Sequence, residues 1–206
     1  MFQLIGILIV ALIIITSIIA HEYMHGLFAD KFGDSTPRVF GRLSLNPLVH
    51  LDPVGTILPV LLMVSGMPFV FGWAKPVPIN PNNFRDPDKD MAIVGLAGPL
   101  ANFTIAVVFS VLMKMIPFPG GDIGGTILMI FRNIVIFNIM LGVFNLIPIP
   151  PLDGSRLLRM FLPYDAARAY DSMEPYGIYI IMLLLVFGGF SDILLRIVNF
   201  ISGFMV

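Results

Sequence analysis

Long apolar runs alternate with short polar stretches along the chain, and the runs end at prolines or glycines. A transmembrane helix needs about 20 predominantly apolar residues, and proline and glycine commonly mark helix ends. The pattern therefore predicts four helical regions: core helices over about 3–32, 87–116 and 126–147, and a C-terminal helical region over 176–206 with a break at 188–189.

Two stretches fit this pattern less simply. Residues 54–72 are apolar enough to cross a membrane but are interrupted by glycines and prolines, so they either span it or enter and return as a re-entrant, partly embedded segment. Residues 39–45 alternate between two faces with the period of a β-strand. This alternation predicts a short edge strand beside the first helix.

The composition is that of an integral membrane protein, since 57% of the residues are apolar, 12% are charged and the mean hydropathy is +0.93. A net charge of −1 without a basic cluster excludes nucleic acid as a partner. The chain has no cysteine, which excludes disulfides and thiolate metal sites. The predicted fold class is an all-α multi-pass membrane protein, with residues 1–206 forming a single domain. Three transmembrane helices form its core, and a short strand or re-entrant segment and one or two C-terminal helices are added to it.

The pentapeptide His21-Glu22-Tyr23-Met24-His25 lies at the end of the first apolar run. Two histidines at positions i and i+4 share one helix face, so both imidazoles can bind one cation, and the glutamate beside the first can act as a general base. An ionisable residue in a lipid-embedded helix is costly and is therefore read as functional. The motif predicts a metal site on the first helix.

A catalytic zinc site needs a third protein ligand and an open position, and the sequence offers His50, Asp153 and Glu174. Asp153 follows a proline-broken helix end of the kind that lines wet cavities in membranes, although it can equally be the N-cap of a helix that begins at Gly154. His50 is a candidate for a fourth ligand, a substrate contact or a loop histidine bonded to nearby backbone.

Asn138 and Asn145 lie seven residues apart in the predicted helix 126–147, hence on one face, which we expect to point inward. Asparagines in membrane helices commonly form hydrogen bonds between helices. Asn145 is also one turn from the break that precedes Asp153, close enough to the metal to donate to a developing oxyanion.

Whether Asp153 can reach the histidines depends on whether residues 54–72 cross the membrane or return to the side from which they enter. If this segment is re-entrant, Asp153 lies on the same side as the metal motif, and nine basic residues lie there too: Lys31, Arg38, Arg42, Lys75, Arg85, Lys89, Arg156, Arg159 and Arg168. The positive-inside rule then makes that side cytoplasmic. We therefore expect a multi-pass protein of the cell membrane with its site nearer the cytoplasm and an extracytoplasmic N-terminus.

Several motifs together resemble those of the site-2 protease family of intramembrane zinc metalloproteases: HEYMH ending an apolar helix, AGPLAN in a later helix and NLIPIPPLDG at the end of the next. The stretches GRLSLNPLVHLDPVGT and FGWAKPVPINP are similar to the small prokaryotic branch that lacks a PDZ or CBS domain. The resemblance implies one zinc ion per chain, held by His21, His25 and Asp153. It also implies Glu22 as the general base and Asn145 as the group that polarises the scissile carbonyl, and it assigns no firm role to His50, Asn102 or Asn138.

The function expected from these motifs is hydrolysis of peptide bonds in or near the transmembrane helix of a membrane-protein substrate, within the lipid bilayer. The predicted strand, with Leu43 and Leu45, together with the extended loop 76–81 would hold the unwound substrate, and His50 is a further candidate contact. The alternatives are a zinc transporter or channel and a non-catalytic scaffold with a structural zinc. The sequence leaves the substrate, the cleavage position, regulation and the oligomeric state open.

Overall fold

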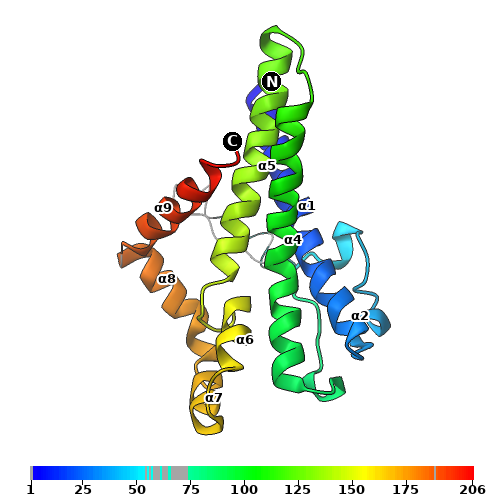
Figure 1. The fold of residues 1–206 in the computed structure, drawn as a ribbon, viewed down its shortest axis with the longest axis vertical. Helices are drawn as coiled ribbons and strands as arrows, with labels where there is room; N and C mark the ends of the chain where they lie inside the picture. The colour runs from blue at the N-terminus through cyan, green and yellow to red at the C-terminus, as the bar shows by residue number, and fades with distance from the viewer. Residues whose placement is uncertain are drawn as a thin grey trace.

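The computed structural model describes residues 2–53, 55, 57, 61, 65, 74–187 and 189–206, and the regular elements of this part of the chain are all helices (Figure 1). The α-helices are α1 (Phe2–Lys31), α2 (Thr36–Val39), α4 (Pro87–Met115), α5 (Gly121–Asn145), α6 (Asp153–Arg159), α7 (Tyr164–Asp171), α8 (Gly177–Phe187) and α9 (Phe190–Ser202). Three single-turn 3-10 helices cover Pro47–Val49, Pro81–Asn83 and Glu174–Tyr176.

The three long helices α1, α4 and α5 run side by side and form the core (Figure 1). Leu8–Lys31, α4 and α5 are each long and apolar enough to cross a membrane. The N-terminus and the α4–α5 connection lie at one end of this core, whereas α2, the start of α4, α6 and α7 lie at the other (Figure 1). The three predicted core helices are confirmed.

Local sequence explains where α4 and α5 begin. Asp86 caps α4 because its side chain accepts a hydrogen bond from Lys89 N at 3.3 Å, and Pro87 occupies the first turn. Helix α5 begins five residues before the predicted start at 126. The chain turns so tightly before α5 that a side chain at Gly124, in the first turn of the helix, would overlap the carbonyl oxygen of Pro119.

The prediction of a strand over 39–45 is wrong, because no strand occurs among the described residues and the segment begins inside a helix. Pro37 lies in the first turn of α2, and Asp34 Oδ1 accepts a hydrogen bond from Thr36 N at 3.1 Å. Gly41 then turns the chain with a φ of 66°. A period of two over seven residues could not outweigh these local turn signals.

The question of whether residues 54–72 span or re-enter lies largely outside the described residues. In the C-terminal region, the break predicted at 188–189 is found between α8 and α9, where Gly189 has a left-handed φ of 59°. The segment Tyr164–Val186 and α9 are long enough for one span only as a pair bent by 81°.

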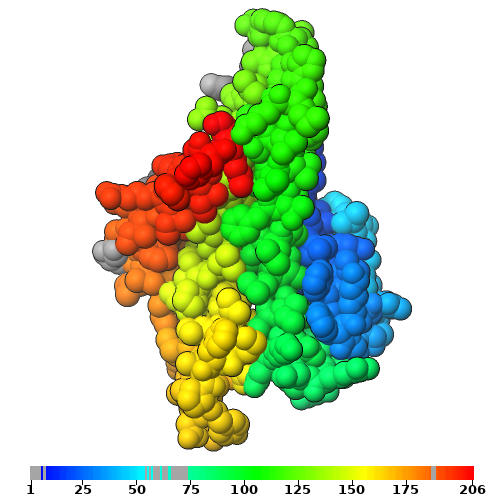
Figure 2. Space-filling view, in the orientation of Figure 1, coloured from blue at the N-terminus to red at the C-terminus, as the bar shows by residue number. Residues whose placement is uncertain are grey.

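One apolar cluster lies between α4, α5 and α9, where Ala106, Val135, Ile139 and Val198 are almost completely buried, and a second one contains Ala29, Phe84 and Val94. Figure 2 shows α8 and α9 on one side of the long α4–α5 pair and the chain around α2 on the other. The C-terminal helices therefore pack away from the α1 face of the core.

Candidate metal centre

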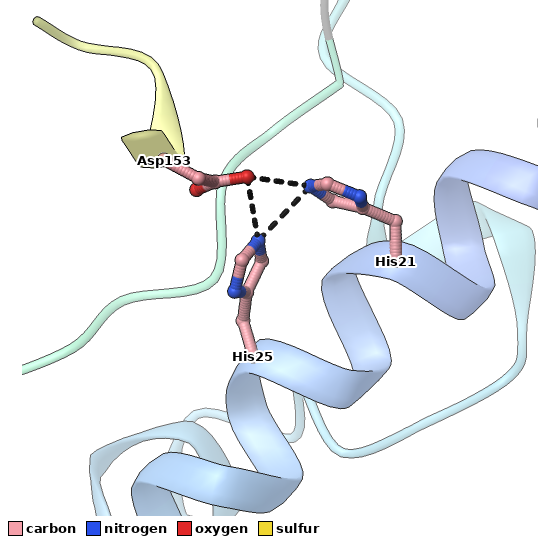
Figure 3. Close-up of side chains that lie close together, drawn as sticks. All are labelled: His21, His25 and Asp153. Carbon is pink, nitrogen blue, oxygen red and sulfur yellow. Dashed lines mark hydrogen bonds and ion pairs between the residues drawn. The ribbon is translucent and has the colours of Figure 1, made fainter. Parts of the chain in front are cut away.

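The last third of α1 presents two histidines to the interior of the core. His21 and His25 are one turn apart, and their Nε2 atoms are 3.0 Å from each other (Figure 3). Both residues are nearly fully buried, at 5% and 6% exposure. The sequence prediction that the two imidazoles share one helix face is confirmed.

Asp153, the first residue of α6, faces the same two imidazoles (Figure 3). Its Oδ2 atom lies 3.0 Å from His21 Nε2 and 3.3 Å from His25 Nε2. Asp153 is the first residue of α6 and its carboxylate points at the imidazoles, while α6 has no side-chain N-cap. The approach depends on Gly154, because a Cβ there would overlap the carbonyl oxygen of Leu146 at the end of α5.

The far nitrogen of each imidazole is held by a hydrogen-bond acceptor. His25 Nδ1 lies 2.7 Å from the carbonyl oxygen of Val94, and His21 Nδ1 lies 2.6 Å from Asn102 Oδ1. A carbonyl oxygen only accepts, so each Nδ1 carries a proton and donates. In the neutral imidazoles, both Nε2 lone pairs then point at the Asp153 carboxylate.

This arrangement fits a zinc ion. The lone pairs of His21 Nε2, His25 Nε2 and Asp153 Oδ2 point to one place without a proton between them. No donor among the described residues reaches Asp153 Oδ2, although this atom is buried. A tetrahedral ion with bonds of about 2.0–2.1 Å separates its ligand atoms by about 3.3 Å, close to the observed 3.0, 3.0 and 3.3 Å. Within the described part of the chain, this is the one group of three such side chains arranged to hold a metal.

Helix α4 packs against the two histidines at a glycine, Gly98. A Cβ on Gly98 would lie 2.6 Å from His21 Nε2 and closer still to His25 Nε2. Any side chain at this position would enter the space between the imidazoles. Gly98 therefore leaves the space that an ion and its ligands need.

Electrostatics favour an ionised Asp153. Burial alone would raise the pKa of its carboxyl group, but when the imidazoles are protonated, the charge of His25 and the hydrogen bonds from His21 and His25 outweigh that effect and hold the pKa below its ordinary value. The carboxylate is thus available as an anionic ligand at neutral pH.

Glu22 lies beside the histidines and is fastened to an extended loop. Its Oε2 atom accepts a hydrogen bond from Val77 N at 2.9 Å. Arg42 holds the same loop, since its guanidinium donates to the carbonyl oxygens of Val49 and Lys75. Burial lowers the pKa of Arg42, and the negative charge of Glu22 opposes that shift. Glu22 and Arg42 therefore both hold this loop, and Glu22 lines the cavity beside the histidines.

The metal-binding group opens into a cavity of about 290 Å³. Asn145 lines this cavity together with His21, Glu22 and Asp153, so the structure brings these four predicted site residues to one place. Asn145 Nδ2 donates to Leu141 O at 3.0 Å. An amide nitrogen carries two hydrogens, so a second one remains for another acceptor. Pro76, Val77 and Ile79 also line the cavity.

The predicted substrate contacts Leu43, Leu45 and His50 do not line this cavity. Leu43 packs near Gly26 of α1, and Leu45 is 67% exposed. His50 is buried, with its Nε2 2.7 Å from Ser44 O, which matches the reading of a loop histidine bonded to nearby backbone. A substrate role for these three residues stays a prediction without a contact to support it.

Glu174, the remaining candidate ligand, is not part of the metal-binding group. It pairs with Arg156 at 3.1 Å instead.

The sequence did not reveal the partners of the histidines. The resemblance assigns no firm role to Asn102, and Gly98 enters the sequence analysis only as part of the stretch AGPLAN. Gly95, Gly98 and Asn102 follow at intervals of three and four residues and so form one stripe of α4. That stripe was the available signal, but only the packing of α4 on α1 shows that it faces the histidines.

Comparison with known proteins gives a consistent result. Residues 120–188 match the model described as Peptidase family M50. The chain is 38% identical over 177 residues to YwhC of Bacillus subtilis, a candidate zinc metalloprotease, and this match covers 84% of the chain and 78% of YwhC. It is 31% identical over 173 residues to Rip2 of Mycolicibacterium smegmatis, which also has the name of a candidate zinc metalloprotease.

A more distant match is the zinc metalloprotease MJ0392 of Methanocaldococcus jannaschii, at 25% identity over 191 residues and 91% of this chain. The aligned part covers 63% of Rip2 and 45% of MJ0392, so the chain spans less than two thirds of these two relatives. No solved structure matches the chain.

Proposed function

The chain belongs to peptidase family M50 and is a zinc metalloprotease of that family; from this premise, we propose that it cleaves membrane-protein substrates in or near their transmembrane segments. The observation that carries the proposal is the convergence of His21, His25 and Asp153 beside an open cavity among the membrane-spanning helices. All of residues 1–206 would form one membrane-embedded catalytic domain.

We assign His21, His25 and Asp153 as the zinc ligands. Their ligand atoms have the spacing of a tetrahedral site, and three ligands leave one position open, as catalytic zinc sites require. His50 does not close the set, because it lies with Ser44 outside the group. This observation counts against a scaffold whose zinc is purely structural.

A bound zinc ion supplies Lewis-acid polarisation of the scissile carbonyl and of the attacking water. Glu22 is the general base: its carboxylate lies on the cavity wall and accepts the proton of the water that attacks the amide carbon. The same proton then goes to the leaving amine. Val77 N–H, bonded to Glu22 Oε2, orients the carboxylate. Asn145 donates its second amide hydrogen to the carbonyl oxygen as negative charge develops there.

The cavity sets a condition on the substrate. A helix is about 10–12 Å across and keeps its peptide groups in internal hydrogen bonds, whereas a cavity of about 290 Å³ accommodates only a few residues of chain. The substrate must therefore unwind before cleavage. The extended residues 74–80, three of which line the cavity, give the unwound backbone a matching wall.

The distribution of charge supports a cytoplasmic position for the site. Lys31, Arg38, Lys89 and the arginines of α6 and α7 lie on elements at the metal-bearing end of the core (Figure 1). By the positive-inside rule this end faces the cytoplasm, and the N-terminal end of α1 faces the other side. Reactivity of single cysteines introduced at Ser35 and Gly120 toward an impermeant reagent tests this orientation.

A zinc transporter would need several ligand sites along the membrane. The described residues hold one such group, at one depth. No observation favours transport over hydrolysis.

The decisive test is Glu22→Gln in purified, zinc-loaded protein with a model substrate that contains one transmembrane helix. We expect cleavage to fall by at least about 100-fold, because the general base is lost, while zinc stays near one ion per chain. Asp153→Ala is the matched control, which should lose both zinc and cleavage. Full cleavage by Glu22→Gln, or zinc retention by Asp153→Ala, would refute the assignment.

A further inference from the structure

A chain of buried hydrogen bonds leads from His21 away from the cavity into the core. His21 Nδ1 bonds to Asn102 Oδ1 at 2.6 Å, and Asn102 Nδ2 donates to Asn138 Oδ1 at 2.9 Å. Asn138 Nδ2 donates in turn to Ser17 Oγ and to the carbonyl oxygen of Ile134, both at 2.9 Å. The network joins α1, α4 and α5, and the side chains of Asn102 and Asn138 are completely buried.

The direction of every bond in this network follows from its far end. The carbonyl oxygen of Ile134 cannot donate, so the amide nitrogen of Asn138 must face it and the amide oxygen must face Asn102. Asn102 consequently turns its nitrogen toward Asn138 and its oxygen toward His21. A second backbone carbonyl, that of Ser17, accepts from Asn102 Nδ2 at 3.4 Å and supports the same orientation.

We propose that Asn102 and Asn138 are positioning residues that hold the His21 proton on Nδ1, which leaves Nε2 free to bind the metal. This inference rests on the proposed role of His21 as a ligand. Asn102 acts through the imidazole, and Asn138 acts through Asn102 by preventing its amide from rotating. Neither side chain is among the residues that line the cavity.

The two histidines differ in the kind of acceptor that holds the proton on Nδ1. His25 donates to the carbonyl oxygen of Val94, which is part of the backbone of α4 and cannot turn around. His21 relies on a side-chain amide, which offers an acceptor in one orientation and a donor in the other. An acceptor of this kind needs a second partner to fix its orientation, and Asn138 is that partner.

A purely structural role is the competing explanation, since asparagines also hold membrane helices together. The two roles predict different responses to substitution. A helix contact is lost equally with any residue that cannot donate to Asn138, whereas the positioning role needs only an acceptor opposite His21 Nδ1. Asn102→Asp retains that acceptor, and Asn102→Leu removes it at similar size.

The test measures zinc affinity by chelator competition in purified protein. Outer partners of metal-bound histidines typically contribute 10–100-fold to affinity, so we expect Asn102→Leu to bind zinc about 10–100-fold more weakly. Asn102→Asp should stay within about 5-fold of the wild type, and Asn138→Leu should lose about 3–10-fold. Asn133→Leu is the matched control on α5, because its side chain has no hydrogen bond among the described residues; it should bind zinc normally.

The second readout is the tautomer of His21 in the metal-free protein, from the ring ¹⁵N resonances. The chain has only three histidines, and His21 is assigned by the loss of its signals in His21→Gln. We expect the proton on Nδ1 in the wild type and in Asn102→Asp, and a shift toward Nε2 in Asn102→Leu. Asn138→Leu provides the same test with the side chains of Asn102 and His21 both unchanged, should Asn102→Leu fail to fold.

Each failure has a separate signature. A wild-type proton on Nε2, or normal zinc affinity and tautomer in Asn102→Leu, overturns the positioning role alone. Equal loss of zinc in Asn102→Asp and Asn102→Leu would assign Asn102 to helix packing. Normal zinc affinity in His21→Gln would instead refute the proposed zinc site itself.

Discussion

The two halves of the α4–α5 pair are buried in different ways. Toward the metal, α4 presents Gly95, Gly98 and Asn102 to its neighbours, and the contacts are directional hydrogen bonds and close backbone approaches. Toward the opposite end, the buried residues are mainly aliphatic and α9 covers them, with Ser110 donating one hydrogen bond to the carbonyl oxygen of Met205. In lipid, apolar contact between helices gains no hydrophobic energy, so the aliphatic half is held chiefly by packing. The polar half sets atom positions, and the aliphatic half holds the helices together.

The contrast is sharpest at two adjacent residues of α5. Asn138 and Ile139 are both completely buried. Asn138 points into the network of His21, whereas Ile139 belongs to the cluster with Ala106 and Val198. One substitution at each position therefore separates the two kinds of burial.

Gly98→Ala should have the largest effect, because the new Cβ would lie within contact distance of both Nε2 atoms. We expect zinc affinity to fall by more than about 100-fold, beyond the usual cost of an outer-partner change. The measurement is zinc content after dialysis against a chelator. Gly125→Ala, where nothing lies within 4 Å of the added Cβ, is the matched control. Normal zinc content in Gly98→Ala would mean that the site is looser than its distances indicate.

Ile139→Ala should act on stability alone. Removing a buried aliphatic side chain leaves a cavity in the cluster, and we expect a loss of about 1–3 kcal/mol in the free energy of unfolding. Zinc affinity should stay within about 2-fold of the wild type, since Ile139 has no part in the polar network. Reversible unfolding in mixed micelles and chelator competition measure the two quantities.

Asn138→Leu should give the reverse result, with weaker zinc binding and a smaller change in unfolding free energy than Ile139→Ala. The leucine fills the space but cannot orient Asn102. If the two variants changed both quantities in the same ratio, the division between a polar and an aliphatic half would be wrong.

Asp34 should give the smallest effect. It lies at the metal-bearing end without contact to the histidines, and its carboxylate accepts hydrogen bonds from Thr36, Asn80 and Asn83. Burial alone would raise its pKa, but these donors outweigh that effect and hold the pKa below its ordinary value.

A lowered folded-state pKa means that Asp34 stabilises the protein above the unfolded-state pKa, near 4, and that this stabilisation is lost as pH falls through the folded value. Asp34→Asn should therefore cost about 1 kcal/mol at pH 7 and less at pH 3.5. Unfolding midpoints at the two pH values measure the difference. A cost that grew toward low pH would contradict the role of the charge.

The helical regions could be predicted because each depends on a long local pattern. Twenty or more apolar residues predict a membrane helix whatever surrounds it, and the three core helices agree with that pattern. The strand over 39–45 could not be judged in the same way. Seven alternating residues carry a weak signal, and Pro37 with the turn at Gly41 overrides it.

The residues of the candidate site likewise divide into those that local sequence places together and those that only the tertiary fold places together. His21 and His25 are four residues apart, so helix geometry alone places them together. The local sequence around Asp153 favours an N-cap and a metal ligand equally, and only the resemblance to the site-2 protease family favours the ligand. Its position beside the imidazoles depends on how α6 approaches the core past Gly154.

The sequence by itself determined the membrane class, the long helices and the pair of histidines, because these follow from periodicity within one segment. The tertiary structure alone decided which acceptor faces each imidazole: Asn102 is 81 residues from His21, and Asn138 is 121 residues from Ser17. The reason is physical, since a hydrogen bond depends on the distance and orientation of two groups, and residue types along the chain specify neither across separate helices.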